Sequence, residues 1–331
     1  MSVEPQAVTQ PVRVKPYSRT LRRAAERLAP FLFLIVIGIV LSILSPYFLT
    51  VRNLLTVLLQ MSIIGIIAVG ETLVMLTAGI DLSVGSVVGL AGVLSTLLMV
   101  QLHWPIWLSV LAGILAGAVI GCLNGVLITT TKLPPFIATL GMMSVARGFA
   151  LILTGGVAIF NVPQAFNWLG GGHVLGVPVP VYFLAAVTVI GTFVLNRTLL
   201  GQYAFAIGSN PETARLSGIR IAKYLVCIYT IQGLLAGLGG VIQASRIVTG
   251  QPTAGLGYEL DVIAACVIGG TSLFGGEGTV LGAIIGAALM ELIRNGADLL
   301  NISAFWQDVI IGIIIWVAVA WDGYRRRVLN R

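Results

Sequence analysis

The octapeptide GIDLSVGS, Gly79–Ser86, places groups that can bind polar partners between two long apolar runs. It contains one carboxylate, Asp81, and two hydroxyls, Ser83 and Ser86. Glycine lets a chain turn without a Cβ clash, and Asp and Ser cap helix N-termini. We therefore expect Asp81 and Ser83 to cap a helix that begins near Leu82. The same groups present a polar surface to a passing solute, so capping and gating both stay open.

Other polar side chains also interrupt apolar runs. A charged group at membrane depth costs about 2.5–3.5 kcal/mol on insertion scales and usually faces the interior of a bundle. Glu71 is expected to be buried in one of three ways: paired with a base such as Arg147, as a neutral carboxyl, or lining a path. Asn124 either joins two helices by a hydrogen bond or lines that path. The candidates for a translocation path or gate are Glu71, Asp81, Ser83, Ser86, Asn124, Thr139 and Thr271.

The sequence carries no signature of a nucleotide or metal site of its own. A P-loop needs Gly-Lys-Ser/Thr, because its lysine must reach the β- and γ-phosphates. None of the three lysines follows a glycine. Cys122, Cys227 and Cys266 lie far apart, which predicts buried packing and no metal ligation. We expect no catalytic residues, no metal and no cofactor bound by this chain.

The composition is that of a membrane protein, with 57% hydrophobic and 9% charged residues and a mean hydropathy of +1.01. A soluble domain is about 25% charged. Because a spanning helix needs roughly 20 apolar residues, the long runs predict an all-α polytopic protein with about ten transmembrane helices in a lipid bilayer. The predicted segments are 29–45, 53–78, 82–101, 105–130, 135–154, 179–196, 222–245, 259–270, 278–296 and 304–322.

The eighth segment, 259–270, is too short to cross a bilayer alone. Its start carries Glu259 and Asp261, and its end runs into the glycine-rich stretch 269–276. Such backbone is tolerated at membrane depth only where it is buried in protein or lines a wet cavity. The sequence therefore predicts a broken or re-entrant helix here.

Basic residues orient these segments. With ten crossings, fifteen of the 19 Lys and Arg lie on the side of both termini and three on the other. The positive-inside rule then makes both termini cytoplasmic. The predicted organisation is a basic cytoplasmic tail over 1–28, one transmembrane domain over 29–322 and a second basic tail over 323–331. Because the charge of +7 gathers in these flanks, it is an orientation signal, and no nucleic-acid partner is expected.

The longest predicted cytoplasmic connection contains signals for one short helix. Asn210 or Ser209 can cap its start, and Pro211 suits the first helical position. Glu212 favours the positive end of the helix dipole, and Gly218 suits a left-handed stop. These signals predict a helix of about seven residues within 210–218.

This helix is either a plain connector or a docking element. A connector between spans needs only a few residues, whereas 197–223 holds a capped helix that presents Glu212, Arg215 and Leu216 to water. Docking to a partner is therefore the favoured interpretation.

Three stretches in this order, GIDLSVGS, GSNPETARLSGI and GGTSLFGGEGTVLGA, resemble the ribose/xylose/arabinose-type sugar permease family of ABC importers. The second contains Glu212-Thr213-Ala214-x-x-x-Gly218, which is similar to the EAA-x-x-x-G element of such permeases with Thr213 in place of the second alanine. The resemblance covers about residues 50–322. It is specific for the family and much less so for the substrate.

The resemblance implies a permease subunit in the bacterial inner membrane. Its implied partners are a second permease chain, identical or related, a cytoplasmic ATP-binding subunit that uses ATP and Mg, and an extracytoplasmic sugar-binding protein. It also implies that the short helix couples to the ATPase through Asn210, Pro211, Glu212, Ala214, Arg215, Leu216 and Gly218.

A sugar is neutral and rich in hydroxyls, so its path needs scattered donors and acceptors. We expect weak intrinsic affinity, with selectivity supplied by the binding protein. The few outside charges, Arg52, Arg246 and Arg294, are predicted to dock that protein, or equally to anchor at lipid headgroups.

Other functions remain open. Within the superfamily the solute is a sugar, a nucleoside, a branched-chain amino acid or a sugar-like signal. A secondary transporter would carry ion-coupled carboxylates and need no partner, and the capped cytoplasmic helix argues against it. A membrane scaffold would not need so many intramembrane acids and glycine breaks.

Overall fold

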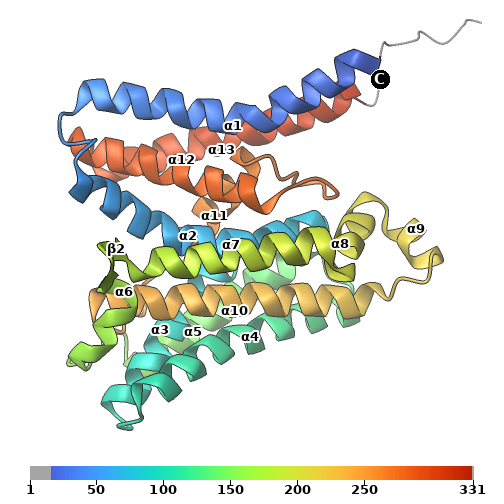
Figure 1. The fold of residues 1–331 in the computed structure, drawn as a ribbon. Coiled ribbons are helices and arrows are strands. Elements are labelled where there is room, and N and C mark those ends of the chain that lie inside the picture. Colours follow the sequence, from blue (N-terminus) through green and yellow to red (C-terminus); the bar gives the residue numbers. More distant parts are fainter. Residues whose placement is uncertain (1–15, 330–331) are drawn as a thin grey trace, which may run out of the picture.

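The computed structural model describes residues 16–329, which fold into a bundle of helices (Figure 1). The helices are α1 (Pro16–Leu44), α2 (Val51–Leu76), α3 (Val84–Val100), α4 (Ile106–Thr131), α5 (Pro135–Thr154), α6 (Trp168–Gly171), α7 (Val179–Arg197), α8 (Leu199–Ser209), α9 (Pro211–Leu216), α10 (Ile221–Ile247), α11 (Tyr258–Ile268), α12 (Val280–Leu299) and α13 (Ala304–Leu329). A 3-10 turn, η1 (Gln164–Asn167), and a small antiparallel hairpin, β1 (His173–Val174) and β2 (Val177–Pro178), complete the described chain.

Six described helices are long and apolar enough to cross a membrane: α2, α4, α5, α7, α10 and α12. Shorter apolar helical stretches lie in α1, α3 and α13. Helix α1 begins at Pro16 and α13 runs to Leu329, so both continue through the predicted domain boundaries. The rest of the predicted N-terminal tail, residues 1–15, lies outside the described residues.

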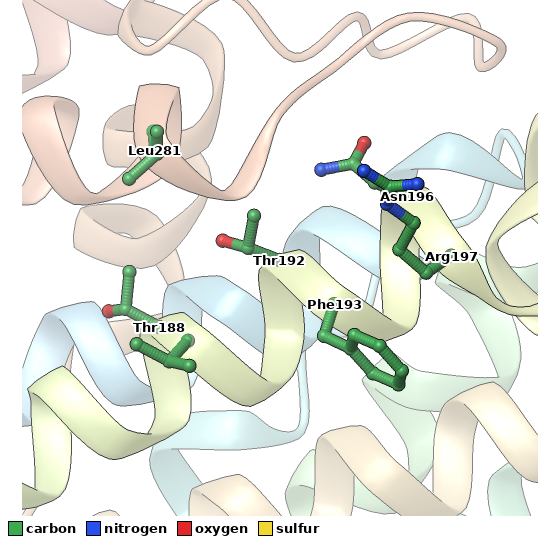
Figure 2. Close-up of a pocket in the computed structure, with 7 residues that line it drawn as sticks. Thr188, Thr192, Phe193, Asn196, Arg197 and Leu281 are labelled. Atoms are coloured by element: carbon green, nitrogen blue, oxygen red, sulfur yellow. The ribbon is translucent and has the colours of Figure 1, made fainter.

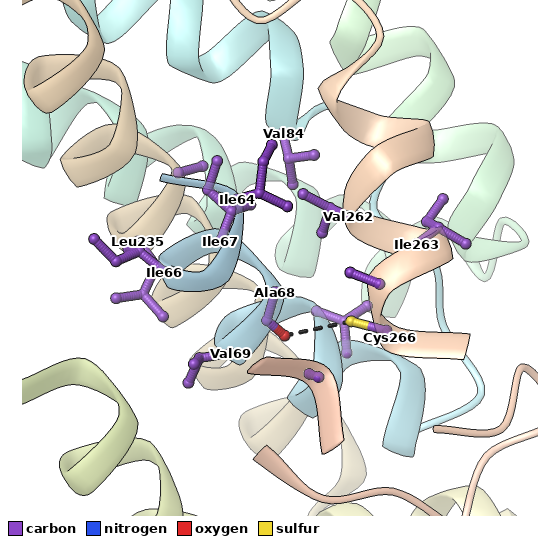
Figure 3. Packing of buried hydrophobic residues seen from close by; sticks show 14 of the residues in the cluster. Ile64, Ile66, Ile67, Ala68, Val69, Val84, Leu235, Val262, Ile263 and Cys266 are labelled. Atoms are coloured by element: carbon purple, nitrogen blue, oxygen red, sulfur yellow. Dashed lines mark hydrogen bonds between the residues drawn. The ribbon is translucent and has the colours of Figure 1, made fainter. Parts of the chain in front are cut away.

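Helix α2 lies at the centre of the bundle. Figure 1 shows α1, α12 and α13 on one side of it and α3, α4, α5 and α10 on the other. Its residues Ile66, Ile67 and Ala68 are fully buried in the main apolar core (Figure 3). Cys266 of α11 enters this core and donates to the Ala68 carbonyl at 3.4 Å. Because α2 is enclosed by protein, polar groups on it must find protein partners.

Glycines bring α4 and α10 into backbone contact. Gly117, Gly121 and Gly125 recur every fourth residue on α4. A Cβ on Gly117 would overlap the Gly233 carbonyl of α10, and one on Gly121 would overlap the Tyr229 carbonyl. Small residues at this spacing let helices pack closely where lipid provides no hydrophobic drive between them. This contact holds α10 beside the break between α2 and α3 described below.

Two sequence predictions need correction. The connection 197–223 contains a second helix, α8, because Ala204 and Ile207 bury one of its faces in the core. Buried packing holds for Cys266 alone, since Cys122 is only partly buried and Cys227 is exposed.

Replacing Gly121 with Ala is expected to destabilise the protein by about 1–3 kcal/mol, because the new methyl group overpacks the α4–α10 contact. Equilibrium unfolding in detergent micelles measures this. Gly141→Ala in α5 is the matched control, since a Cβ there meets nothing within 4 Å. Equal stability of the two variants would contradict the proposed contact.

Candidate functional site

The octapeptide singled out in the sequence forms a break between α2 and α3. Helix α2 ends at Leu76, and Ala78 turns the chain with a φ of 59°. The Gly79 N–H donates to the Val74 carbonyl at 3.2 Å. A Cβ on Gly79 would lie 2.5 Å from the Tyr229 hydroxyl, so glycine is required by packing. Residues 77–83 therefore run as non-helical backbone inside the protein.

Side chains from neighbouring helices satisfy this backbone. The Asp81 N–H donates to Glu71 Oε1 at 3.0 Å. The Leu82 N–H donates to Thr139 Oγ1 at 3.2 Å, and the Thr139 hydroxyl lies 3.1 Å from the Ile80 carbonyl, to which it donates. Unpaired backbone groups at this depth are costly. Glu71 and Thr139 thus hold the break in place.

Asp81 and Ser83 act differently from the expected helix cap. Ser83 occupies the N-cap position of α3, but its side chain makes no capping hydrogen bond. Instead, Asp81 Oδ1 accepts from the Ser83 N–H at 2.9 Å and from the Ser83 hydroxyl at 2.6 Å. This is a local Asx-turn. Asn124 Nδ2 of α4 donates to Ser83 Oγ at 3.0 Å, which is the interhelical hydrogen bond foreseen for this amide.

The expected pairing of Glu71 with Arg147 is wrong. Glu71 Oε2 accepts from Gln232 Nε2 of α10 at 2.9 Å, so amides occupy both of its oxygens. Arg147 instead donates to the carbonyls of Pro252 and Ala254 at 2.5 and 2.9 Å. A guanidinium has several donors in fixed directions and can serve several carbonyls at once.

The carbonyls that Arg147 binds belong to a non-helical segment of turns, residues 249–257, that leads from α10 to α11. This segment packs along α3, where Gly250 meets Thr96 and Gly255 meets Gly85. Beyond the eleven-residue α11, the chain again leaves helical geometry over 269–279. A short helix with non-helical chain on both sides matches the broken helix expected from the sequence. The loop 269–279 also lies against the break between α2 and α3.

Two candidate path residues lie apart from the hydrogen-bonded group. Ser86 is buried in the first turn of α3. Thr271 lies in the loop 269–279, where its buried hydroxyl has no hydrogen-bond partner. The break brings Glu71, Asp81, Ser83, Asn124 and Thr139 together, and all seven candidates are 2% exposed or less.

A hollow of about 650 Å³ lies elsewhere, between α7 and the first turn of α12 (Figure 2). Thr188, Thr192 and Leu281 are among its lining residues, which mix polar and apolar side chains and include none of the seven path candidates. Figure 2 shows Arg197 at the edge of this hollow. The hollow lies on the side of α7 and is separate from the hydrogen-bonded residues of the α2–α3 break.

The short helix predicted in the connection 197–223 forms over the six residues of α9. Asn210 is its cap, because Asn210 Oδ1 accepts from the Thr213 N–H at 2.9 Å. Pro211 occupies the first turn, and Gly218 stops the helix with a φ of 83°. The Gly218 N–H donates to the Arg215 carbonyl at 3.0 Å. Local signals therefore account for both ends of α9.

Helix α9 has one anchored face and one free face. Ala214 is 3% exposed, whereas Leu216 is 76% exposed. Glu212 and Arg215 form an exposed ion pair at 2.6 Å, and the Glu212 carboxylate raises the pKa of Arg215 above its ordinary value. Surface ion pairs add little stability. An exposed leucine beside this pair provides a small surface for a partner.

The three arginines predicted to lie outside differ in their availability. Arg52 is exposed at the start of α2, and Arg246 is half-buried at the end of α10. Arg294 of α12 is held by Asp261 of α11, with N–O distances of 2.8 and 2.9 Å. Arg294 therefore has a structural role in the described conformation.

Gln232 and Tyr229 of α10 were not among the predicted site residues. Both are fully buried beside the break. A glutamine within an apolar run was the available signal for Gln232, but its pairing with Glu71 spans 161 positions.

Residues 53–319 match the protein family described as branched-chain amino acid transport system / permease component. The ribose import permease protein RbsC of Escherichia coli (strain K12) is 41% identical over 297 residues, covering 88% of this chain and 92% of RbsC. RbsC of Bacillus subtilis (strain 168) is 44% identical over 299 residues, covering 90% and 92%. The L-arabinose ABC transporter permease protein AraH of Azospirillum brasilense is 39% identical over 292 residues, covering 88% and 86%. No solved structure matches the chain.

Glu71→Ala is expected to destabilise the protein by about 1–3 kcal/mol for each of the two buried donors that lose their acceptor. Glu71→Gln is expected to stay near wild type. Its carbonyl still accepts from Asp81, and Gln232 can rotate to present Oε1, which has no partner now. Chemical unfolding in micelles compares the variants, and equal loss in both would contradict these hydrogen bonds.

Arg147→Met is expected to expose the segment 249–257 by leaving the Pro252 and Ala254 carbonyls without donors. Amide hydrogen exchange of this segment measures the effect. Exchange is expected to rise locally, because the free energy of opening this segment falls by about 1–3 kcal/mol. Arg147→Lys keeps a cationic donor and serves as the partial control. Unchanged exchange in both variants would refute this role.

Proposed function

This chain belongs to the permease-component family of ABC importers, and from this premise we propose that it carries a monosaccharide across the inner membrane. It is a multi-pass membrane protein and a permease component, not an enzyme. The observation that best supports coupling to an ATPase is the geometry of helix α9. This helix is capped at both ends, anchored by Ala214 and exposed at Leu216.

The monosaccharide assignment comes from the relatives. Those with 39–44% identity are named for ribose and L-arabinose import or transport, and they align over almost the whole chain. The buried polar group of this chain suits a neutral solute, since hydroxyls and amides outnumber charges around the α2–α3 break. Nucleosides, branched-chain amino acids and sugar-like signals are the alternatives within the superfamily.

We infer ten crossings with both chain ends in the cytoplasm. The six long helices supply six crossings, and α1, α3 and α13 supply apolar stretches for three more. The tenth combines α11 with its non-helical flanks. In Figure 1 the start of α1, the end of α13 and α9 lie at one end of the bundle, and α6 and β2 lie at the other. The basic residues of the sequence favour the α9 end as cytoplasmic.

The proposed partners follow from this orientation. A cytoplasmic ATPase docks on α9 and uses ATP and Mg, and this chain itself binds neither. A second permease chain, identical or related, completes the path. A sugar-binding protein delivers the solute to the opposite end, where Arg52 and Arg246 are proposed to meet its acidic groups. Arg294 is a weaker candidate because Asp261 already holds it.

The break between α2 and α3 is the proposed gate. Its seven candidate residues are buried in the described conformation, so transport requires this region to open. Glu71, Thr139 and Asn124 come from three different helices, and small relative movements of those helices would expose their donors and acceptors. The path is proposed to bind the sugar weakly, with selectivity set by the binding protein.

Uptake of labelled ribose and L-arabinose tests the proposal, with the chain reconstituted in vesicles together with its ATPase and binding protein. Wild type is expected to take up sugar only with ATP. The double variant Glu212→Ala, Gly218→Pro is expected to lose uptake and ATPase binding, because proline cannot adopt the φ of 83° at Gly218 or donate to the Arg215 carbonyl. Gly141→Ala is the control. Uptake without ATP or ATPase would make this a secondary transporter or channel.

A further inference from the structure

Three pieces of backbone meet directly beside the start of α9. They are the end of α2 (Leu76–Ala78), the end of α8 (Gly208–Ser209) and the turn Gly275–Gly276, here called the three-way junction. The Gly276 N–H donates to the Leu76 carbonyl at 3.0 Å, which joins the turn to α2. Segments separated by more than sixty residues in sequence thus share one point.

The three-way junction has no room for side chains at its centre. A Cβ on Gly208 would overlap the Leu76 carbonyl and lie 2.8 Å from the Gly276 nitrogen. A Cβ on Gly275 would lie 2.9 Å from both the Ala78 nitrogen and Gly208 Cα. Contacts below 3 Å force a shift when the neighbour is backbone. The junction is therefore a stiff backbone-to-backbone contact.

On one side, the junction continues directly into α9, with no linker residues between them. Ser209 ends α8, and the next residue, Asn210, caps α9. Ala204 belongs to the main core and Ile207 is also buried, so α8 is packed against the core that contains α2. A displacement of α9 must therefore displace Gly208 and Ser209.

On the other side, the junction leads into both intramembrane breaks. Ala78 begins the segment that Glu71 and Thr139 hold by its Asp81 and Leu82 amides. Gly276 belongs to the loop 269–279, which connects the end of α11 to the start of α12. Movement at the junction would reach the proposed gate through a few residues of tightly packed backbone.

We propose that the contact between Gly208 and Leu76 is the point at which movement of α9 is transmitted to the α2–α3 break. This inference rests on the proposed function, because it requires an ATPase on α9. Gly208 is a positioning residue, and it acts only if its backbone stays against the Leu76 carbonyl throughout the transport cycle.

Gly208→Ala tests the proposal in the reconstituted importer, because its methyl group must push α8 away from α2. The ATP hydrolysed per sugar imported is expected to rise about tenfold, within the usual range of coupling between sites. The ATPase is expected to stay bound, since α9 itself is unchanged. Gly141→Ala, with open space around its Cβ, is expected to keep the wild-type ratio.

An unchanged ratio in Gly208→Ala would overturn the proposal, whether uptake and ATP hydrolysis both stay at their wild-type rates or both fall in proportion. Absence of ATP-driven uptake in the unmodified chain would instead reject the proposed function, and this inference with it. Normal coupling in Gly208→Ala rejects the inference alone.

A cross-link tests the same contact without an overpacked variant. Ala78 and Ser209 are both exposed at the junction, so the pair Ala78→Cys, Ser209→Cys can be joined by a short, reducible bis-thiosulfonate. A contact that stays closed predicts unchanged uptake after cross-linking. Loss of uptake that reduction restores would show that the two elements separate during transport, and would overturn the proposal even if Gly208→Ala fails to assemble.

Discussion

Non-helical backbone inside this protein has no water to bind, so every break in a helix depends on protein groups that complete its hydrogen bonds. The segment 77–83 depends on Glu71 and Thr139, and the segment 249–257 depends on Arg147. The starts of α3 and α11 follow from these partners. Glu71 and Arg147 thus serve the backbone first, and any contact with a solute must compete with that role.

Close helix packing makes these partners available. Glycines on α4 and α10 let the two backbones touch, which seats Gln232 and Tyr229 beside α2. Van der Waals contact of this kind is the main attraction between helices in lipid. The same device recurs at Gly208, where α8 meets the end of α2. Glycine therefore contributes twice, by permitting turns and by removing side chains where helices must approach.

The two proposed functional regions differ in how they are built. Helix α9 is a local structure whose cap, stop and exposed leucine lie within nine consecutive residues. The break is a tertiary structure, because its hydrogen bonds come from α2, α4 and α5. A local element can dock a partner without disturbing the core. A gate must be tied to several helices so that their relative movement opens it.

Features that depend on neighbouring residues could be predicted from the sequence. Apolar run lengths located the helical segments, and Asn210, Pro211 and Gly218 located α9, because capping and turn preferences act within a few positions. The contacts between distant groups became known from the three-dimensional arrangement of the helices. Charge suggested Arg147 as the partner of Glu71, but helix packing placed Gln232 there and turned Arg147 to the carbonyls of Pro252 and Ala254. Helix α8 likewise depends on burial of Ala204 and Ile207. Such pairings follow from how helices pack in space, which no local pattern encodes.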